Sequence, residues 1–88
     1  MGTYMNVIDI KQIGERVSRL MNENKLTDAK LAEILHVTIQ CVNKWRHGRC
    51  IPDVQNLVNL SHIFQTSTDY LLTGKEYEHE EDYYDLSA

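Results

Sequence analysis

The sequence predicts an all-α domain of five short helices. Apolar residues recur at spacings of three and four through most of the chain, which is the period of helices packed on a common core. Threonine or proline stands near the start of several of these segments, as is usual at helix N-termini. No stretch alternates apolar and polar residues as a half-buried strand would. With 88 residues, the chain is long enough for one domain.

The first helix is expected from about Asp9 or Ile10 to Asn24, after a lead-in of residues 1–8. Gly14 lies within its first turns and costs about 1 kcal/mol there relative to alanine, so we expect it to permit a close contact. The apolar residues of this segment form one stripe: Ile13, Val17, Leu20 and Met21.

A pair of helices separated by a very short turn follows. Thr27 is a good N-cap for a helix over about residues 28–35, and Thr38 for a helix over about residues 39–47. Helices joined this tightly cross at a steep angle, so the second can stand clear of the body. The residues expected to face the core from this pair are Leu31, Ile34, Leu35, Val42 and Trp45.

Two further helices complete the domain. The fourth covers about residues 53–65 and begins beside Pro52, whose missing N–H costs nothing at a helix start. The fifth covers about residues 68–72 and ends at Gly74. Their expected core residues are Leu57, Leu60, Ile63, Phe64, Leu71 and Leu72. The domain is therefore expected over residues 9–75, followed by a tail over residues 76–88.

Several functional classes are disfavoured by the composition. The apolar runs are too short for a membrane-spanning helix, and the N-terminus lacks the basic and apolar blocks of a signal peptide, so we expect a cytoplasmic protein. Cys41, His47 and Cys50 match no common zinc spacing and lack a fourth ligand, so no metal or cofactor is expected. No catalytic triad, phosphate loop or paired-carboxylate motif is recognisable, and we expect no enzyme.

Charge is distributed unevenly along the chain, whose formal net charge is −4. Between Lys11 and Lys75, nine Lys and Arg residues outnumber six acids, a formal +3, whereas residues 76–88 hold six acids and no Lys or Arg. A mildly basic body suits nucleic acid. The acidic tail, which also carries tyrosines, leaves three interpretations open: a disordered solubilising segment, a peptide for a protein partner, or a segment that competes with DNA for the basic face.

A series of short motifs occurs in a fixed order: Ile13-Gly14-Glu15-Arg16-Val17, Leu26-Thr27 through Leu31-Ala32, Val37-Thr38 to Lys44-Trp45, Gly48, Pro52 with Leu57, Leu60 and Phe64, then Ser67, Asp69, Leu71-Leu72 and Gly74. In this order they resemble the lambda-repressor-like, Cro/CI-type (XRE family) helix-turn-helix domain, over about Ile10 to Lys75. The resemblance implies a five-helix fold with the helix-turn-helix at the second and third helices.

The outer face of the third helix holds the candidate DNA-reading residues: Ile39, Gln40, Asn43 and Lys44. A helix fits the major groove, where each base pair shows a distinct set of donors and acceptors. A glutamine or asparagine amide can pair with adenine N6 and N7, a lysine can reach guanine or phosphate, and an isoleucine can pack on a thymine methyl group. The alternative is an ordinary solvated helix face, with Ile39 closing the edge of the core.

Contacts to the DNA backbone are expected from the helix ends and from the loop after the third helix. The candidates are Thr27, Thr38, Arg46, His47 and Arg49. A protonated histidine binds phosphate better than a neutral one, so His47 predicts a modest pH dependence of binding.

Some positions depart from the family pattern. Asp28 stands where a polar residue often meets the DNA backbone, and its charge would repel phosphate. Arg46 stands where an acid is common and Met21 where an arginine is common, which leaves Arg46 free for DNA or for the acidic tail. His36 and Gln65 replace glycines that leave a helix with positive φ, at a cost of about 1 kcal/mol each.

The function expected from these features is a sequence-specific duplex-DNA-binding transcriptional regulator. It is expected to be a repressor of bacterial, phage or mobile-element origin and to act as a homodimer on a two-fold symmetric site. The alternative is a protein-interaction module on the same fold, an antitoxin or adaptor with weak or no DNA binding. The net charge, Asp28 and the acidic tail favour that alternative.

Overall fold

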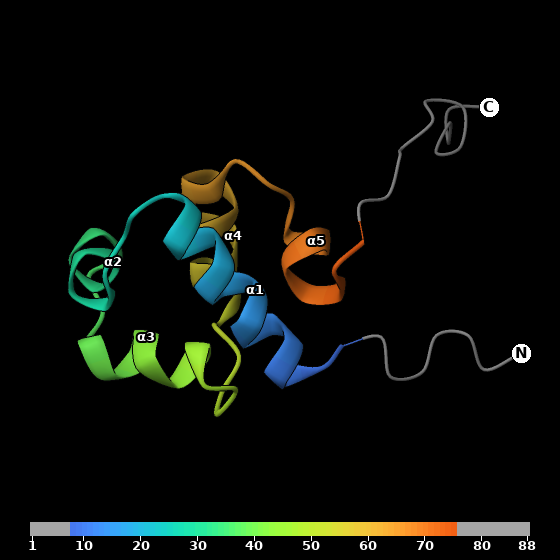
Figure 1. The fold of residues 1–88 in the computed structure, drawn as a ribbon, viewed down its shortest axis with the longest axis horizontal. Helices are drawn as coiled ribbons and strands as arrows, with labels where there is room; N and C mark the ends of the chain where they lie inside the picture. The colour runs from blue at the N-terminus through green and yellow to red at the C-terminus, as the bar shows by residue number, and fades with distance from the viewer. Residues whose placement is uncertain (1–7, 76–88) are drawn as a thin grey trace, which may run out of the picture.

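The computed structural model describes residues 8–75, and within that range it contains only helices. Figure 1 shows α1 across the middle of the molecule, with α4 behind it, α2 and α3 at one end and α5 at the other. The predicted all-α class of five helices is confirmed. The elements are α1 (Ile10–Glu23), α2 (Asp28–Leu35), α3 (Ile39–Arg46), α4 (Val54–Phe64) and α5 (Thr68–Thr73). No helix in this range is both long and apolar enough to cross a membrane.

Each helix begins at a residue whose side-chain oxygen accepts a backbone N–H from the first turn, which satisfies a donor that the helix itself leaves free. Thr27 and Thr38 are N-caps as predicted. The fourth helix is capped by Asp53, so it starts one residue later than expected, and α3 ends at Arg46 because His47 is its C-cap. The five N-caps are Asp9, Thr27, Thr38, Asp53 and Ser67.

The predicted positive φ angles at two helix ends are confirmed. His36 has φ 60° and Gln65 has φ 55°, so each reverses the chain in the left-handed region without the help of glycine. Lys25, between α1 and α2, has φ 57° and was not predicted, because its position in a connector carries no sequence signal for it. Three non-glycine residues therefore hold the strained conformation that positions the helices.

The core forms between α1 and the helices around it. One prediction was wrong: Ile34 is 41% exposed, and Ala32 takes the inward place. In a helix, Leu31, Ala32 and Leu35 share one side, and Ile34 lies about 100° round from its centre. Ile63 and Leu72 are only half-buried at the edge of the cluster. The buried hydrophobic cluster comprises Ile13, Val17, Leu20, Met21, Leu31, Ala32, Leu35, Val42, Trp45, Leu60, Phe64 and Leu71.

Gly14 permits the close packing of α1 on α3. A Cβ atom at this position would lie 2.5 Å from the carbonyl oxygen of Trp45 and 2.7 Å from that of Arg46. Both distances are far shorter than a normal carbon–oxygen contact, so any side chain would push the two helices apart. The predicted close contact at Gly14 is therefore confirmed, and it sets the depth at which the C-terminal end of α3 lies against the body.

Arg16 joins α1 to α5. Its side chain is 9% exposed, and its Nε and Nη2 atoms donate to the carbonyl oxygens of Leu71 and Leu72, each at 3.1 Å. These carbonyls lie in the last turn of α5, where intrahelical donors are lacking and a cation is favoured by the helix dipole. The arginine thus fastens a six-residue helix that is too short to be stable alone.

Candidate nucleic-acid interface

Helices α2 and α3 form a tight helix-turn-helix. Residues 36–38 connect them. In Figure 1, α3 lies along the lower edge of the molecule, with its C-terminal end toward α1. Val42 is fully buried and Trp45 is 4% exposed, so these two side chains anchor α3 to the core as predicted. With that side buried, the opposite side of α3 faces outward.

The predicted base-contacting residues lie together on this outward face. Ile39 is 50% exposed and thus does not close the core. All four side chains are exposed and line one shallow groove of about 280 Å³, together with the predicted backbone-contacting Arg49. The residues around the groove are Ile39, Gln40, Asn43, Lys44 and Arg49. The groove therefore brings together amide, ammonium, guanidinium and apolar groups. These are the groups that bind base edges and phosphates.

Thr27 and Thr38 are exposed at the starts of α2 and α3. Their hydroxyl oxygens accept backbone N–H groups from Lys30, at 3.0 Å, and from Cys41, at 3.1 Å. A hydroxyl that accepts in this way keeps its own hydrogen for donation. Both hydroxyls can therefore cap their helices and bind a phosphate oxygen at the same time.

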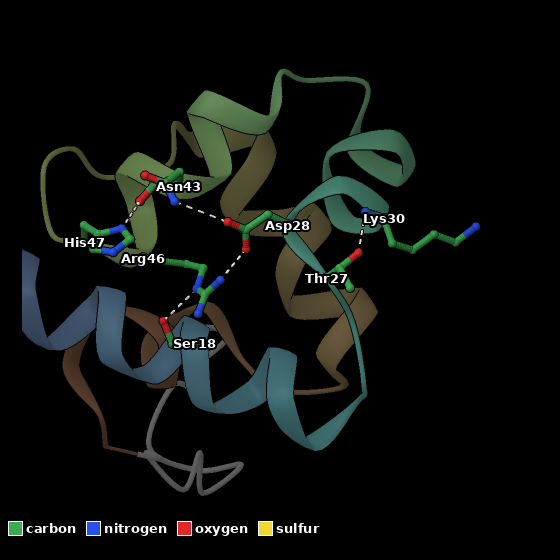
Figure 2. A network of polar contacts seen from close by, with 7 residues as sticks. All are labelled: Ser18, Thr27, Asp28, Lys30, Asn43, Arg46 and His47. Atoms are coloured by element: carbon green, nitrogen blue, oxygen red, sulfur yellow. Dashed lines mark hydrogen bonds and ion pairs between the residues drawn. The ribbon is translucent and has the colours of Figure 1, made fainter.

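Arg46 is not free, contrary to the sequence-based expectation. It forms an ion pair through Nη1 with Asp28 Oδ1, and its Nε donates to Ser18 Oγ at 3.1 Å. The side chains of Arg46 and Asp28 are 31% and 19% exposed. Figure 2 shows the guanidinium between Asp28 on α2 and Ser18 on α1. In the sequence, Asp28 and Arg46 each depart from the family pattern, and we considered them separately. Their opposite charges could have indicated that they form a pair.

Asp28 also contacts the outward face of α3. Its Oδ2 atom accepts from Asn43 Nδ2 at 3.3 Å. The carboxylate that was expected to repel phosphate is thus neutralised by an arginine and hydrogen-bonded to an outward-facing amide. Sequence reasoning missed Asp28 and Ser18 as members of this site.

His47 caps the C-terminus of α3. Its Nδ1 atom lies 2.9 Å from the carbonyl oxygen of Asn43. A carbonyl only accepts hydrogen bonds, so this contact requires the hydrogen on Nδ1. The neutral ring then carries its hydrogen on Nδ1 and none on Nε2, so Nε2 can only accept.

Helix α3 and the three residues after it carry basic side chains and no acid. Residues 39–49 contain Lys44, Arg46 and Arg49 and no acid. Cys41 and Cys50 are free thiols, and residues 8–75 contain no group of three or more His, Cys, Asp and Glu side chains placed for a metal ion. The predictions for the acidic tail concern residues 76–88, which lie outside the described residues.

The fold and this face define a helix-turn-helix domain of the type that presents its second helix to DNA. The family model described as "Helix-turn-helix" matches residues 17–71, and the chain belongs to this family, of the XRE type that the sequence resembles.

Named relatives are transcriptional regulators. The chain is 32% identical to the HTH-type transcriptional activator BcrR of Enterococcus faecalis over 74% of its own length and 32% of that protein. It is 34% identical to the SPbeta prophage-derived regulator YonR of Bacillus subtilis, over 69% of this chain and 56% of that one. It is 32% identical to repressor protein C2 of Salmonella phage P22, over 70% and 29%. The chain thus matches about half or less of each of these relatives.

Solved structures give the same result. The P22 c2 repressor in complex with a synthetic operator superposes with a TM-score of 0.68 and 32% identity, over 72% of this chain and 96% of that one. A transcriptional regulator from Listeria innocua gives a TM-score of 0.68 and 33% identity, over 82% and 66%.

Proposed function

We propose that this chain is a transcriptional regulator that binds specific duplex DNA through α3. The observation that carries the proposal is the shallow groove that gathers Ile39, Gln40, Asn43, Lys44 and Arg49 on the exposed side of α3. The likeness to a repressor that was solved with its operator supports it. A protein-interaction module would not need this arrangement of base-matching side chains.

In the proposed complex, α3 enters the major groove. Gln40 and Asn43 present amides that match adenine, Lys44 reaches guanine or phosphate, and Ile39 packs on a thymine methyl group. Thr27, Thr38, His47 and Arg49 bind the phosphates that flank these bases and set the register of the helix. Arg46 binds Asp28 through Nη1 and Ser18 through Nε, and its Nη2 can still donate to a phosphate.

The direction of regulation is proposed to be repression, because a bound domain of this size can occlude a promoter. The names of the relatives include both an activator and a repressor. A reporter placed behind the selected DNA site distinguishes them: expression falls on addition of a repressor and rises with an activator.

A homodimer on a two-fold site is also proposed. Helix α3 has only eight residues, and a second copy one turn along the DNA doubles the number of bases read. Footprints over two half-sites about 34 Å apart, together with a dimer mass by sedimentation, would support this state. A single half-site protected by a monomer would contradict it.

The acidic tail is proposed as the site of any protein partner. Deletion of residues 76–88 tests this separately from DNA binding. Loss of a co-purifying partner with unchanged DNA affinity supports the proposal, whereas a rise in DNA affinity at low salt shows that the tail competes for the basic face.

The central test is selection of bound sequences from random duplexes, followed by affinity measurements on the selected site. Gln40→Ala is expected to weaken binding by about 1 to 3 kcal/mol and to relax the preference at one base pair. Gln55→Ala changes an exposed glutamine of α4 that does not line the groove, and should leave the base preference unchanged. No enriched sequence, and a stable complex with another protein instead, would favour the interaction-module alternative.

A further inference from the structure

One carboxylate lies at the centre of the polar contacts between α1, α2 and α3. Asp28 is the first residue of α2, yet its side chain is only 19% exposed because the side chains of Arg46 and Asn43 surround it. Ser18, on α1, accepts from the same arginine. Figure 2 shows Asp28 directed toward α3 rather than toward solvent.

The two carboxylate oxygens have different partners. Oδ1 receives the guanidinium of Arg46, and Oδ2 accepts from Asn43. The arginine balances the negative charge, so Asp28 can lie beside the DNA-facing side of α3 without a net repulsion of phosphate. Arg46 also holds the carboxylate in place, since its own Nε donates to Ser18 Oγ at 3.1 Å.

This arrangement decides which end of the Asn43 amide points outward. A carboxylate only accepts hydrogen bonds, so the nitrogen of the amide must face Asp28 and the oxygen must face away. In Figure 2 the oxygen of Asn43 points away from Asp28. One amide hydrogen is used by Asp28, and the oxygen and the second hydrogen remain, which is the pair that adenine N6 and N7 require.

We propose that Asp28 is a positioning residue that fixes the amide of Asn43 for reading one base pair, with Arg46 and Ser18 holding the carboxylate in place. The proposal rests on the proposed DNA-binding function. Asp28 would make no contact with the base itself; without it, the amide can rotate and present either its donor or its acceptor end.

The first measurement needs no DNA. The side-chain amide resonances of Asn43, followed by ¹H–¹⁵N spectroscopy, should shift in Asp28→Ala and remain in place in Glu33→Ala. Glu33 is a matched control, because it lies on the same helix and carries the same charge. Its ion pair among residues 8–75 is with Lys30, at 3.7 Å, and 74% of its side chain is exposed. Unchanged Asn43 resonances in Asp28→Ala would overturn the proposal whatever the protein binds.

The second measurement uses the selected duplex and its single-base variants. At the base pair that Asn43→Ala identifies, the wild-type preference of about tenfold should fall below about twofold in Asp28→Ala. Affinity for unrelated duplex should stay the same or rise, because an acid has been removed. A merely structural role would instead lower affinity for every sequence alike.

The double variant closes the test. If Asp28 acts through Asn43, Asp28→Ala with Asn43→Ala should lose no more selectivity than either single variant. Losses that add in the double variant would overturn the proposal. Failure of the proposed function would look different, because the unaltered chain would then select no sequence at all.

Discussion

Two arginines fasten opposite ends of the molecule, and their surroundings differ. Arg16 is buried and binds two backbone carbonyls of α5. Arg46 is partly exposed and binds two side chains, one on α2 and one on α1. Backbone carbonyls are present whatever the local sequence, whereas an aspartate and a serine must be encoded. The first contact therefore closes the fold, and the second is specific to the face that is proposed to bind DNA.

The largest effect on stability is expected at Arg16, the buried arginine. Arg16→Met should lower the free energy of unfolding by about 3 kcal/mol, because two charge-assisted hydrogen bonds are lost and the carbonyls of Leu71 and Leu72 stay poorly solvated. Urea unfolding followed by circular dichroism measures it. Arg19→Met is the control on the same helix. Arg19 also reaches α5, through the Tyr70 hydroxyl, but this contact and its pair with Glu23 are exposed and together should be worth about 1 kcal/mol or less. Equal losses in both variants would show that burial of Arg16 does not matter.

Gly14→Ala tests the packing of α1 against α3. The added methyl group meets the carbonyl oxygens of Trp45 and Arg46, and we expect a net loss of about 2 kcal/mol, despite the better helix propensity of alanine. Thermal unfolding is a sufficient measurement. A more stable variant would mean that α1 and α3 can separate at little cost.

Arg46→Met should separate stability from binding. The free energy of unfolding is expected to fall by about 1 kcal/mol or less, because the pair with Asp28 is partly exposed. DNA affinity is expected to fall by a similar amount even for unrelated sequences, since Asp28 then faces phosphate unpaired. Addition of Asp28→Ala in the same chain should restore that general affinity. If it does not, Arg46 itself contacts DNA.

The smallest effect concerns His47. His47→Ala removes the ring whose Nδ1 donates to the Asn43 carbonyl, and the free energy of unfolding should fall by less than about 1 kcal/mol, because this contact is exposed. Urea unfolding measures the change. A larger loss would mean that the contact holds the C-terminal end of α3 in place.

Local sequence signals were sufficient for most of the helices. The capping threonines, the apolar spacing and Gly74 predicted helix ends to within one or two residues, because caps and periodicity act over a few neighbouring positions. The inward place of Ala32 in preference to Ile34 was not predictable in this way. It depends on the direction from which α3 and the rest of the core pack against α2, and no local pattern contains that direction.

The sequence by itself therefore determined the five helices, the helix-turn-helix and the outward residues of α3, since helical period and capping place them on one side. Only the tertiary structure decided that Arg46 pairs with Asp28, that Asp28 holds Asn43, and that Arg16 reaches α5. These contacts join residues 15 to 56 positions apart. Such partners meet only after the helices have packed, because the crossing geometry and not the spacing in the chain brings them within hydrogen-bond distance.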